Sequence, residues 1–460
     1  MSVRVIVLAA GKGTRMRSVL PKVLHVAAGR PLVGWVLDAV AGVEPDETVA
    51  VVGHGAEAVE AALPAGVTTV VQEEQLGTGH AASVGLEALG DVDGDQILIV
   101  PGDSPLLTSP TLAALLEAHA AGDHPVTLLT AVMGDPTGYG RVLRSDAGVT
   151  GIVEERDATP EQRALQEVAV STYVFEGSAL AGALGEMVAA NDQGELYLTD
   201  AVGLLAGRGG AGSASVEDPT EVVGVNSHDQ LAAAARLLRE RINLGLMEAG
   251  VKMDDPARVY VDAGVEVEAG ARLYPGVHLE GATTVAAGAE VGPDTFVADG
   301  VIGPGARVWY SVLRGVEVGP RAEVGPYASL RPGTVMAEGT KAGTFVEMKA
   351  TALGAGSKVP HLSYIGDSTI GAGSNIGAGT ITCNYDGFAK HHTIIGDGVF
   401  IGSDTMLVAP VEVGDGAVTG AGSVITKDVS PGSLAVERSS QREIPGYAER
   451  RARMAESEGD

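Results

Sequence analysis

The sequence predicts an α/β domain with a mostly parallel sheet, followed by one helix and then a left-handed parallel β-helix. Two patterns indicate this order. Over residues 1–226, short aliphatic runs alternate with Ala- and Leu-rich stretches of helical spacing, which is typical of strands and helices that build one parallel sheet. After residue 250, aliphatic residues recur at intervals of six, which is typical of a coil with three short sides.

The composition agrees with these two folds. The chain has 460 residues, which favours two or three domains over one core, and 45% of them are hydrophobic. Only 4% are aromatic, whereas 65 are glycines. A core with few rings and many small residues suits a narrow, repetitive structure.

The charge and the cysteine content narrow the class of partners. The formal net charge is -28, which argues against nucleic acid or an anionic membrane surface as a main partner. One cysteine allows neither an intrachain disulfide nor a thiolate metal cluster, and it fits a reducing compartment. The apolar start VRVIVLAAGKG is too short for a membrane span and lacks a signal cleavage pattern. We expect a cytoplasmic protein that binds small molecules.

In the first domain, runs rich in Val, Ile and Leu predict strands, and the stretches between them predict helices. Strands are expected at 3–8, 48–52, 68–72, 96–100 and 126–133, and helices at 31–41, 55–63, 79–89 and 109–121. In such sheets, ligands bind at the carboxyl ends of the strands. We therefore expect the first site in the loops that follow them.

Residues 227–250 predict a single helix between the two halves. Ser227 can cap its start, and Gly250 can end it. Leu231, Leu238 and Ile242 share one face at helical spacing. We expect a rigid connector, so the predicted domains are 1–226, 227–250 and 251–460.

The repeats of the second half predict a three-sided prism with an aliphatic residue pointing inward on each side. The inward positions are expected at Val267, Leu273, Leu279, Val285, Val291, Val297, Val312, Val318, Val324, Leu330, Ile395, Ile401, Leu407 and Val413. A sandwich of short strands is the alternative, but three runs of one period favour the prism. The segment TITCNYDGFAKHHTIIG, residues 380–396, interrupts the period. A prism tolerates insertions at its corners, so we expect a projecting functional loop, with a passive surface loop as the alternative.

The segment LAAGKGTRM, residues 8–16, directly follows the first predicted strand. Its glycine spacing fits neither a P-loop nor a dinucleotide fingerprint, but Gly11 and Gly13 let backbone N–H groups approach an anion. Four cations lie within eleven residues that begin in this segment: Lys12, Arg15, Arg17 and Lys22. In an acidic chain this concentration predicts a phosphate site, with a solvated basic turn as the alternative.

Asp103 follows the buried run LIVPG, at the carboxyl end of a predicted strand. A carboxylate at that position can hold Mg²⁺ against phosphate oxygens. The alternative is an Asp that starts a turn before Pro105.

His361 is the candidate catalytic group of the prism. It lies in SKVPHLSYIG, where the six-residue spacing is irregular, and Arg331 and Lys349 are cations nearby in the chain. A neutral imidazole titrates near physiological pH and can act as a general base. The alternative is a structural surface histidine.

These motifs resemble one enzyme family over nearly the whole chain. LAAGKGTRM with LPKVLH resembles the sugar-nucleotidyltransferase signature, and EEQLGTGHA, GYGRV, GIVEERDA, GELYLTDAV and GVN follow in order. LRPGT, FVEMK, HLSYIGD, NIGAGTITCNYDG, IGSDT and LVAPV continue the resemblance through the prism. The chain is thereby similar to the bacterial bifunctional N-acetylglucosamine-1-phosphate uridylyltransferase / glucosamine-1-phosphate N-acetyltransferase family, which implies a Rossmann-like nucleotidyltransferase domain and hexapeptide repeats.

The resemblance implies a uridylyltransferase site in the first domain, with Mg²⁺ as cofactor. Arg15 and Lys22 stabilise charge on the phosphates, and Asp103 and Asn226 are the metal ligands. The residues implied to bind UTP or UDP-N-acetylglucosamine are Leu8, Ala9, Ala10, Gly11, Lys22, Gln72, Gly77, Thr78, Gly140, Glu154 and Asn226. A sugar-1-phosphate oxygen attacks the α-phosphate of UTP and releases pyrophosphate, so positioning, cations and metal are expected to carry the catalysis.

The resemblance also implies an acetyltransferase site on the prism, with His361 as general base and a homotrimer as the assembly. Glucosamine-1-phosphate is expected on Arg331, Lys349, Tyr364 and Asn375. Acetyl-CoA is expected on Ala378, Asn384, Tyr385, Ser403, Ala421 and Arg438. Lys390 is expected to contact coenzyme or acceptor. The resemblance thus explains why residues 380–396 interrupt the repeat: the loop that they form is expected to help close the acetyl-CoA site.

Three positions depart from the family pattern. The stretch EVAVSTY has Ala169 where the family usually has an Asn that contacts the sugar nucleotide, so a hydrogen-bonding group is lost. Pro101 precedes Gly-Asp where the family often has Tyr, and Thr344 stands where Asn is common. The sequence therefore indicates the reaction type of the first site more firmly than the sugar that this site prefers.

Three other functions compete with this interpretation. A monofunctional nucleotidyltransferase would use its prism only for assembly. A γ-carbonic-anhydrase-type enzyme needs three His ligands for zinc between subunits and leaves the first half unexplained. A trimeric scaffold needs neither a phosphate loop nor an acidic metal ligand.

Overall fold

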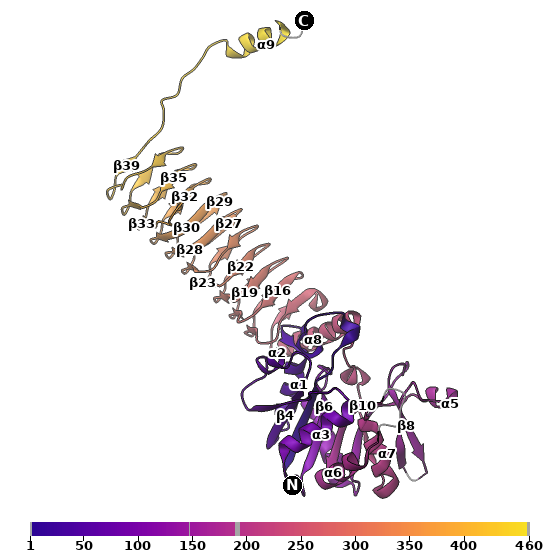
Figure 1. Cartoon of the computed structure of the whole chain (residues 1–460). Coiled ribbons are helices and arrows are strands. Elements are labelled where there is room, and N and C mark those ends of the chain that lie inside the picture. Colours follow the sequence, from indigo (N-terminus) through magenta and orange to yellow (C-terminus); the bar gives the residue numbers. More distant parts are fainter. Residues whose placement is uncertain (1, 147, 189–193, 458–460) are drawn as a thin grey trace. The chain divides into compact units, whose positions relative to one another are not determined.

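The computed structural model describes residues 2–146, 148–188 and 194–457, and the chain divides into two compact units, Met1–Ile242 and Asn243–Asp460. Figure 1 shows that strands and helices alternate in the first unit, whereas the second is a stack of short strands. Each predicted fold class is thus found in its own half. We find no helix in the described parts of the chain that is both long and apolar enough to cross a membrane.

The first unit is built on one sheet whose strands run in the order β11-β7-β10-β6-β1-β4-β5. Those strands are β1 Val3–Ala9, β4 Glu47–Val52, β5 Val67–Val71, β6 Gln96–Pro101, β7 Val126–Val132, β10 Glu167–Glu176 and β11 Gly212–Ser215. The five predicted strands are confirmed within one or two residues, and β1 pairs in parallel with both β4 and β6. β10 is antiparallel to both of its neighbours, and it joins the antiparallel pair β8 Gly140–Ser145 and β9 Gly148–Val153.

Helices lie between the strands, and the four predicted ones are found, although the helix predicted at 55–63 ends at Glu60. They are α1 Leu32–Ala41, α2 Ala56–Glu60, α3 Thr78–Leu89 and α4 Ser109–Ala121; α5 Pro160–Arg163, α6 Gly177–Glu186 and α7 Leu198–Gly209 follow. Along β1, Val5 and Val7 belong to one buried cluster and Ile6 to another. Successive strand residues point to opposite faces, so the sheet is covered on both sides and its strands read as continuous apolar runs.

The predicted connector is the helix α8, His228–Glu248. The division between the two units falls within this helix, after Ile242. Its N-terminal part packs on the first unit through Leu231, Ala234 and Leu238. Gly250 follows with a φ of 100°, and its N–H donates to the carbonyl of Met247. The left-handed backbone at this glycine ends the helix.

The second unit is a parallel β-helix, and within its described residues the strands of successive coils pair in parallel, as Val259 does with Val277. One sheet contains β12 Lys252–Met253, β15 Arg272–Leu273, β18 Glu290–Val291, β21 Arg307–Val308, β24 Glu323–Val324, β27 Lys341–Thr344, β29 Lys358–His361, β31 Asn375–Ile376, β34 Phe400–Ile401, β37 Val418–Thr419 and β39 Leu434–Ala435. The strands of the larger sheet are β13 Val259–Val261, β14 Glu266–Val267, β16 Val277–Glu280, β17 Thr284–Val285, β19 Phe296–Ala298, β20 Val301–Ile302, β22 Val312–Arg314, β23 Val316–Val318, β25 Ser329–Leu330, β26 Thr334–Met336, β28 Glu347–Leu353, β30 Tyr364–Ile370, β32 Ile381–Cys383, β33 Thr393–Ile395, β35 Met406–Val408, β36 Val411–Val413 and β38 Val424–Ile425.

The interior of this prism holds most of the predicted aliphatic residues. Leu279, Val291 and Ile401 have no exposed surface. Two predicted inward positions differ. Val267, in the first coil, is only partly buried, and Val312 is partly buried while its neighbour Leu313 is fully buried. The coil that leads from Val297 to its partner Leu313 is shorter than the coil that leads from Val259 to its partner Val277. The inward position therefore moves by one residue, from Val312 to Leu313.

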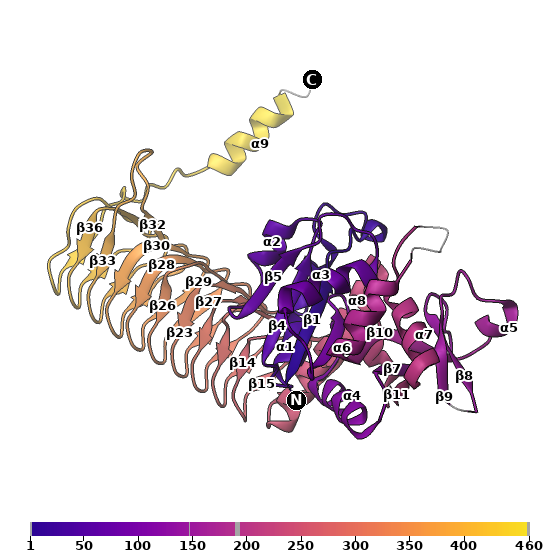
Figure 2. The same ribbon diagram turned by 60° about the horizontal axis from the view of Figure 1, so that its bottom comes forward.

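The segment that interrupts the period connects β32 to β33 and projects from the prism, as Figure 2 shows beside β32. Asp386 organises it, because its carboxylate accepts hydrogen bonds from the N–H groups of Phe388 and Ala389 and from the imidazole of His391. Tyr385 and Lys390 form a bridge across the loop. The side chain of Phe388 is 97% exposed, so the loop presents a ring to its surroundings. The last element of the described residues is α9, Tyr447–Ser457, whose residues are all exposed.

Candidate functional sites

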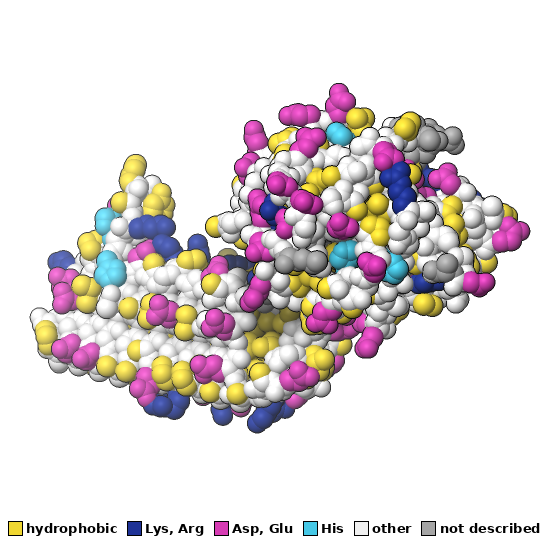
Figure 3. All heavy atoms as spheres, turned by 90° about the horizontal axis from the view of Figure 1, so that it is seen from below, with side chains coloured by type: hydrophobic (Ala, Val, Ile, Leu, Met, Phe, Trp, Pro, Cys, Tyr) yellow, Lys and Arg dark blue, Asp and Glu magenta, His cyan; other side chains and the backbone are white. Residues whose placement is uncertain are grey.

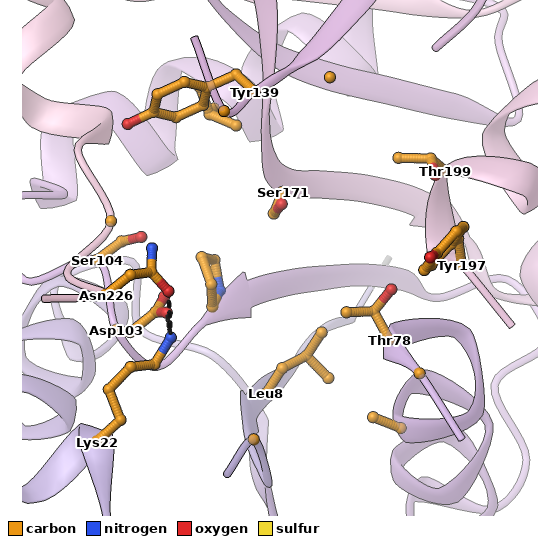
Figure 4. A pocket seen from close by; sticks show the side chains of 18 of the residues that line it. Leu8, Lys22, Thr78, Asp103, Ser104, Tyr139, Ser171, Tyr197, Thr199 and Asn226 are labelled. Atoms are coloured by element: carbon orange, nitrogen blue, oxygen red, sulfur yellow. Dashed lines mark hydrogen bonds and ion pairs between the residues drawn. The ribbon is translucent and has the colours of Figure 1, made fainter. Parts of the chain in front are cut away.

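A cavity of about 750 Å³ lies in the first unit, where the loops after β1 and β6 meet β8 and β10. Figure 4 shows its side chains converging from these elements. The residues predicted for the first site all line it: Leu8, Ala9, Ala10, Gly11, Arg15, Lys22, Gln72, Gly77, Thr78, Asp103, Gly140, Glu154 and Asn226. The predicted set is therefore brought together in space, at the strand ends where the α/β fold favours a ligand.

One end of the cavity combines the glycine loop with Lys22. Gly13 has a φ of 58°, and a Cβ on it would lie 2.7 Å from Cβ of Lys22. A residue with a side chain would push the two segments apart, so this glycine lets the loop pass directly over the lysine. The backbone of the loop and the lysine can then face the same anion.

Lys22 contacts both predicted metal ligands (Figure 4). Its Nζ forms an ion pair with Oδ2 of Asp103 and lies 2.9 Å from Oδ1 of Asn226. The N–H of Val225 donates to the carbonyl of Asp103 at 2.9 Å and holds the two segments together. Two side-chain oxygens thus converge on one positive charge, which is the arrangement that a cation site requires.

These ligands fit a divalent cation that takes its remaining ligands from substrate. Among the described residues, no group of three or more His, Cys, Asp and Glu side chains could hold a metal. Mg²⁺ commonly uses one or two protein ligands together with water and phosphate oxygens. Asp103 and Asn226 offer one carboxylate and one amide oxygen, which matches the one or two protein ligands that Mg²⁺ commonly uses.

The other end of the cavity is formed by β8, β9 and β10. Ala169 pairs with Gly140 across β10 and β8, and a Cβ on Gly140 would lie 3.7 Å from Oε2 of Glu154. Thr199 donates to Oε1 of Glu154 at 3.2 Å. Burial raises the pKa of Glu154, and Asp157 and Asp200 add to the rise. This end offers a carboxylate acceptor and small residues that leave room, as a sugar site needs.

Several residues that line the cavity were not predicted from the sequence, among them Tyr139, Ser171, Tyr197 and Thr199. Tyr139 lies in GYGRV, and Tyr197 and Thr199 lie in GELYLTDAV, so the quoted motifs contained a signal for three of them. Ser171 lies in the stretch EVAVSTY, but nothing in that stretch indicates that its side chain lines the cavity. It enters the cavity because β10 shifts register between Ala169 and Tyr173, where Ser171 adopts a φ of 54°.

On the prism, the predicted acetyl-CoA residues form a row along successive coils. The carbonyl of Ala378 accepts from the N–H of Asp404, and that of Ser403 accepts from the N–H of Gly422. The carbonyl of Ala421 accepts from the guanidinium of Arg438 at 2.6 Å. His361 begins the row, because its carbonyl accepts from the N–H of Gly379 at 3.4 Å.

The predicted acceptor residues lie beside that row. In β28 and β30, Glu347 pairs with Tyr364 and Lys349 with Gly366, while Arg331 contacts Glu347 at 3.0 Å. Tyr364 is three positions after His361 on the same coil. Asn375 pairs with Lys358 at the start of the strand that ends in His361. The strand that ends in His361 thus pairs with the strand of Asn375, and the backbone of His361 contacts Gly379, the residue after Ala378.

The projecting loop reaches the acceptor residues. Asn384, which is 7% exposed, contacts the hydroxyl of Tyr364 at 3.4 Å. Lys390 lies beside Lys349, and the hydrogen bond with Lys349 and the positive charge of Lys349 lower the pKa of Lys390. Figure 3 shows Lys, Arg and His side chains gathered where the loop leaves the prism. This is a concentration of positive charge on an acidic chain, as a phosphate site requires.

Thr344, which departs from the family pattern, lies next to the predicted base. It pairs with His361 across β27 and β29, and its carbonyl accepts from the N–H of Leu362 at 3.0 Å. Its contact with the His361 segment is through the backbone, which a Thr provides as well as an Asn does.

Comparisons with known proteins agree with both halves. A family described as the MobA-like NTP transferase domain matches residues 5–167, and the bacterial transferase hexapeptide family matches residues 392–427. A Streptomyces coelicolor protein named "Bifunctional protein GlmU" is 52% identical over 97% of this chain and 94% of the relative. Proteins of the same name from Kineococcus radiotolerans and Heliobacterium modesticaldum are 50% and 49% identical, over 96% and 94% of this chain and 91% and 95% of the relatives.

Proposed function

Because the chain belongs to the family of bifunctional GlmU proteins, we propose that its two sites catalyse successive steps of UDP-N-acetylglucosamine synthesis. The prism transfers an acetyl group from acetyl-CoA to the amine of glucosamine-1-phosphate. The α/β unit then transfers a uridylyl group from UTP to N-acetylglucosamine-1-phosphate and releases pyrophosphate. The product is a precursor of peptidoglycan and lipopolysaccharide-type envelope polymers.

In the uridylyl transfer, the cavity positions the reactants. The loop from Leu8 to Gly11, with Gln72, Gly77 and Thr78, holds the nucleotide, and Glu154 with Gly140 faces the sugar. Lys22 and Arg15 stabilise the charge that spreads over the phosphates as the sugar phosphate oxygen attacks. Asp103 and Asn226 would hold Mg²⁺, which neutralises phosphate charge when bound.

In the acetyl transfer, His361 is the base. Its imidazole accepts a proton from the amine as the nitrogen bonds to the thioester carbonyl carbon. The C–S bond then breaks, and the coenzyme A sulfur takes the proton from the imidazolium and leaves as the thiol. Arg331 and Lys349 bind the acceptor phosphate, and Tyr364 and Asn375 hold the sugar. The coenzyme lies along the row from Ala378 to Arg438 and against Asn384 and Tyr385.

We propose that the protein is a homotrimer that works in the cytoplasm, where UTP and acetyl-CoA are available. An exposed apolar column on the prism supports the assembly. Tyr310, Tyr327 and Phe345 stack on successive coils, with ring centroids 5.8 and 5.4 Å apart, and Leu362 continues the column at 63% exposure. Exposed apolar columns of this length are typical of protein interfaces, and this one ends next to His361. The mass in solution, measured by light scattering, tests the trimer.

The observation that supports the proposed function most is that one chain contains the residues predicted for both sites, one set lining a cavity of the first unit and the other on neighbouring coils of the second. The test is a coupled assay on purified protein. Glucosamine-1-phosphate and acetyl-CoA are expected to release thiol, and later addition of UTP and Mg²⁺ is expected to release pyrophosphate. Pyrophosphate release from N-acetylglucosamine-1-phosphate without any thiol release would instead support a monofunctional nucleotidyltransferase with a structural prism.

A further inference from the structure

Asp367 lies between the two substrate sites of the prism, although neither site assigns it a role. It is on β30, and its side chain is 20% exposed. Nζ of Lys349 lies 2.9 Å from its Oδ1 and 3.1 Å from its Oδ2. Nδ2 of Asn384 donates to the same Oδ2 at 2.5 Å. One carboxylate therefore joins the lysine proposed for the acceptor phosphate to the asparagine proposed for the coenzyme.

The backbone holds this carboxylate in place. Asp367 has a φ of 49°, a left-handed conformation that Asp tolerates better than most residues. A Cβ on the preceding Gly366 would lie 2.5 Å from the hydroxyl of Tyr364 and 2.7 Å from Nδ2 of Asn384. The N–H of Gly366 donates to the hydroxyl of Thr382 at 2.7 Å. The turn thus brings Tyr364, Asp367 and Asn384 together.

The charges around Asp367 favour its ionised form. Burial acts to raise the pKa of Asp367, but the hydrogen bonds from Lys349 and Asn384 outweigh burial and lower it. The positive charges of Lys349 and Lys390 act in the same direction. At neutral pH the carboxylate therefore carries a full negative charge among cations and a donor amide.

We propose that Asp367 is a positioning residue that couples acceptor binding to coenzyme binding. Its two oxygens orient the Lys349 ammonium and the Asn384 amide at the same time, so a substrate that orders one of them also orders the other. This inference rests on the proposed acetyl transfer, and it predicts that each substrate binds more tightly when the other is present.

The test replaces Asp367 with Asn, which keeps the shape but removes the charge and places a second amide against Asn384. We expect KM for glucosamine-1-phosphate and for acetyl-CoA each to rise roughly tenfold, the effect of losing a charge-assisted hydrogen bond. Calorimetric titration of glucosamine-1-phosphate with and without coenzyme A is expected to show mutual enhancement in the parent protein and none in Asp367→Asn. Asp367→Glu should restore part of the enhancement, which a merely structural role would not require.

Two controls accompany this test. Glu323→Gln removes another prism carboxylate with a lysine partner, since Glu323 contacts Lys341 at 3.0 Å, and both KM values should stay at the parent level. Uridylyl transfer by the same preparation reports on the integrity of the protein.

A second variant covers the case that Asp367→Asn does not fold. Asn384→Leu removes the other partner of the hydrogen bond between Asp367 and Asn384, and retained mutual enhancement in that variant would overturn the inference.

The outcomes separate the inference from the proposed function. An active parent with an Asp367→Asn variant that keeps both KM values and the mutual enhancement would overturn the inference alone. A parent that releases no thiol would overturn the proposed acetyl transfer, and the inference with it. Loss of the enhancement in the variant, with uridylyl transfer intact, supports the inference.

Discussion

The ammonium of Lys22 lies against the carboxylate of Asp103 and 2.9 Å from the amide oxygen of Asn226. It therefore occupies the place where the two proposed metal ligands converge. A cation that binds there must compete with the lysine, and the displaced lysine is then free to turn toward the phosphates. The same group thus has one partner before the reaction and another during it.

From this relationship we predict that Lys22→Met binds a divalent cation more tightly in the absence of nucleotide, because the competing charge is gone. Uridylyl transfer should fall by about a hundredfold or more, since a cation that stabilises phosphate charge is lost. Mn²⁺ titration followed by electron paramagnetic resonance measures the first effect, and pyrophosphate release measures the second. Weaker Mn²⁺ binding in the variant would contradict the competition. Lys12→Met is the control, because Lys12 also lines the cavity but is not part of the Asp103 and Asn226 cluster.

The second prediction concerns the proposed base. His361→Ala should lower acetyl transfer roughly a hundredfold or more, the usual contribution of a general base, and leave uridylyl transfer unchanged because that site is in the other unit. Thiol and pyrophosphate release, measured on one preparation, check both parts. His278→Ala is the matched control: His278 is also on the prism and stacks on Tyr260 with ring centroids 4.3 Å apart. Equal thiol release by His361→Ala and the parent would remove His361 from the mechanism.

The third prediction concerns the sugar end of the cavity. Ala169 is 6% exposed and pairs with Gly140, so an Asn at this position would present its amide beside the sugar. We expect Ala169→Asn to raise kcat/KM for N-acetylglucosamine-1-phosphate about tenfold through one added hydrogen bond. Ala169→Leu has a similar size without the amide and should lower kcat/KM instead. A gain in both variants would point to packing rather than hydrogen bonding.

The fourth prediction follows from the raised pKa of Glu154, which burial causes. The folded protein holds this proton more tightly than the unfolded chain, so stability decreases as the pH rises from the ordinary value of 4.5 through the raised pKa. Glu154→Gln removes the charge and should therefore raise the melting temperature of the α/β unit at pH 7. The difference from the parent should vanish below pH 4.5, and uridylyl transfer should fall because an acceptor for the sugar is lost.

Glu186 is the control for this pH dependence, because its pKa is shifted in the opposite direction to that of Glu154. Its hydrogen bond with Arg208 lowers the pKa of Glu186, so its contribution to stability is present at neutral pH and is lost as the pH falls through the lowered pKa. Glu186→Gln should not raise the melting temperature at pH 7. Melting curves of both variants between pH 4 and pH 8 give the two signs directly, and stabilisation by both substitutions would refute the burial argument.

The local patterns of the sequence were sufficient for the main strands and helices up to residue 133, for the connecting helix and for the repeat of the prism. The strands that became β1, β4 and β6 are continuous apolar runs because the sheet is buried on both faces. β10 was not predicted, since the region after residue 133 was not divided into elements. The inward position at Leu313 was not predicted either. One shorter coil shifts the six-residue spacing, and because Val312 and Leu313 are both aliphatic, the residue types do not reveal the shift.

For the sites, residue types and motifs identified the groups but not their neighbours. Gly13, Lys22 and Asp103 were predicted to belong to a phosphate and cation site from their spacing and their position after strands, and the structure brings Lys22 and Asp103 into contact. Ser171 was not recognisable, because its place in the cavity depends on an irregular register in β10. Asp367 was quoted only as part of a motif, because its contacts lie on adjacent coils.

By itself, the sequence determined the two fold classes, the order of the two halves and the side chains that are candidates for binding and catalysis. It could do so because hydrophobic period and glycine placement are local properties of the chain. Only the tertiary structure decided which of these residues meet. Lys22 contacts Asn226 across 204 positions of the chain, and Asp367 contacts both Lys349 and Asn384 from neighbouring coils. Such contacts depend on how strands pair and coils stack, and no local pattern records them.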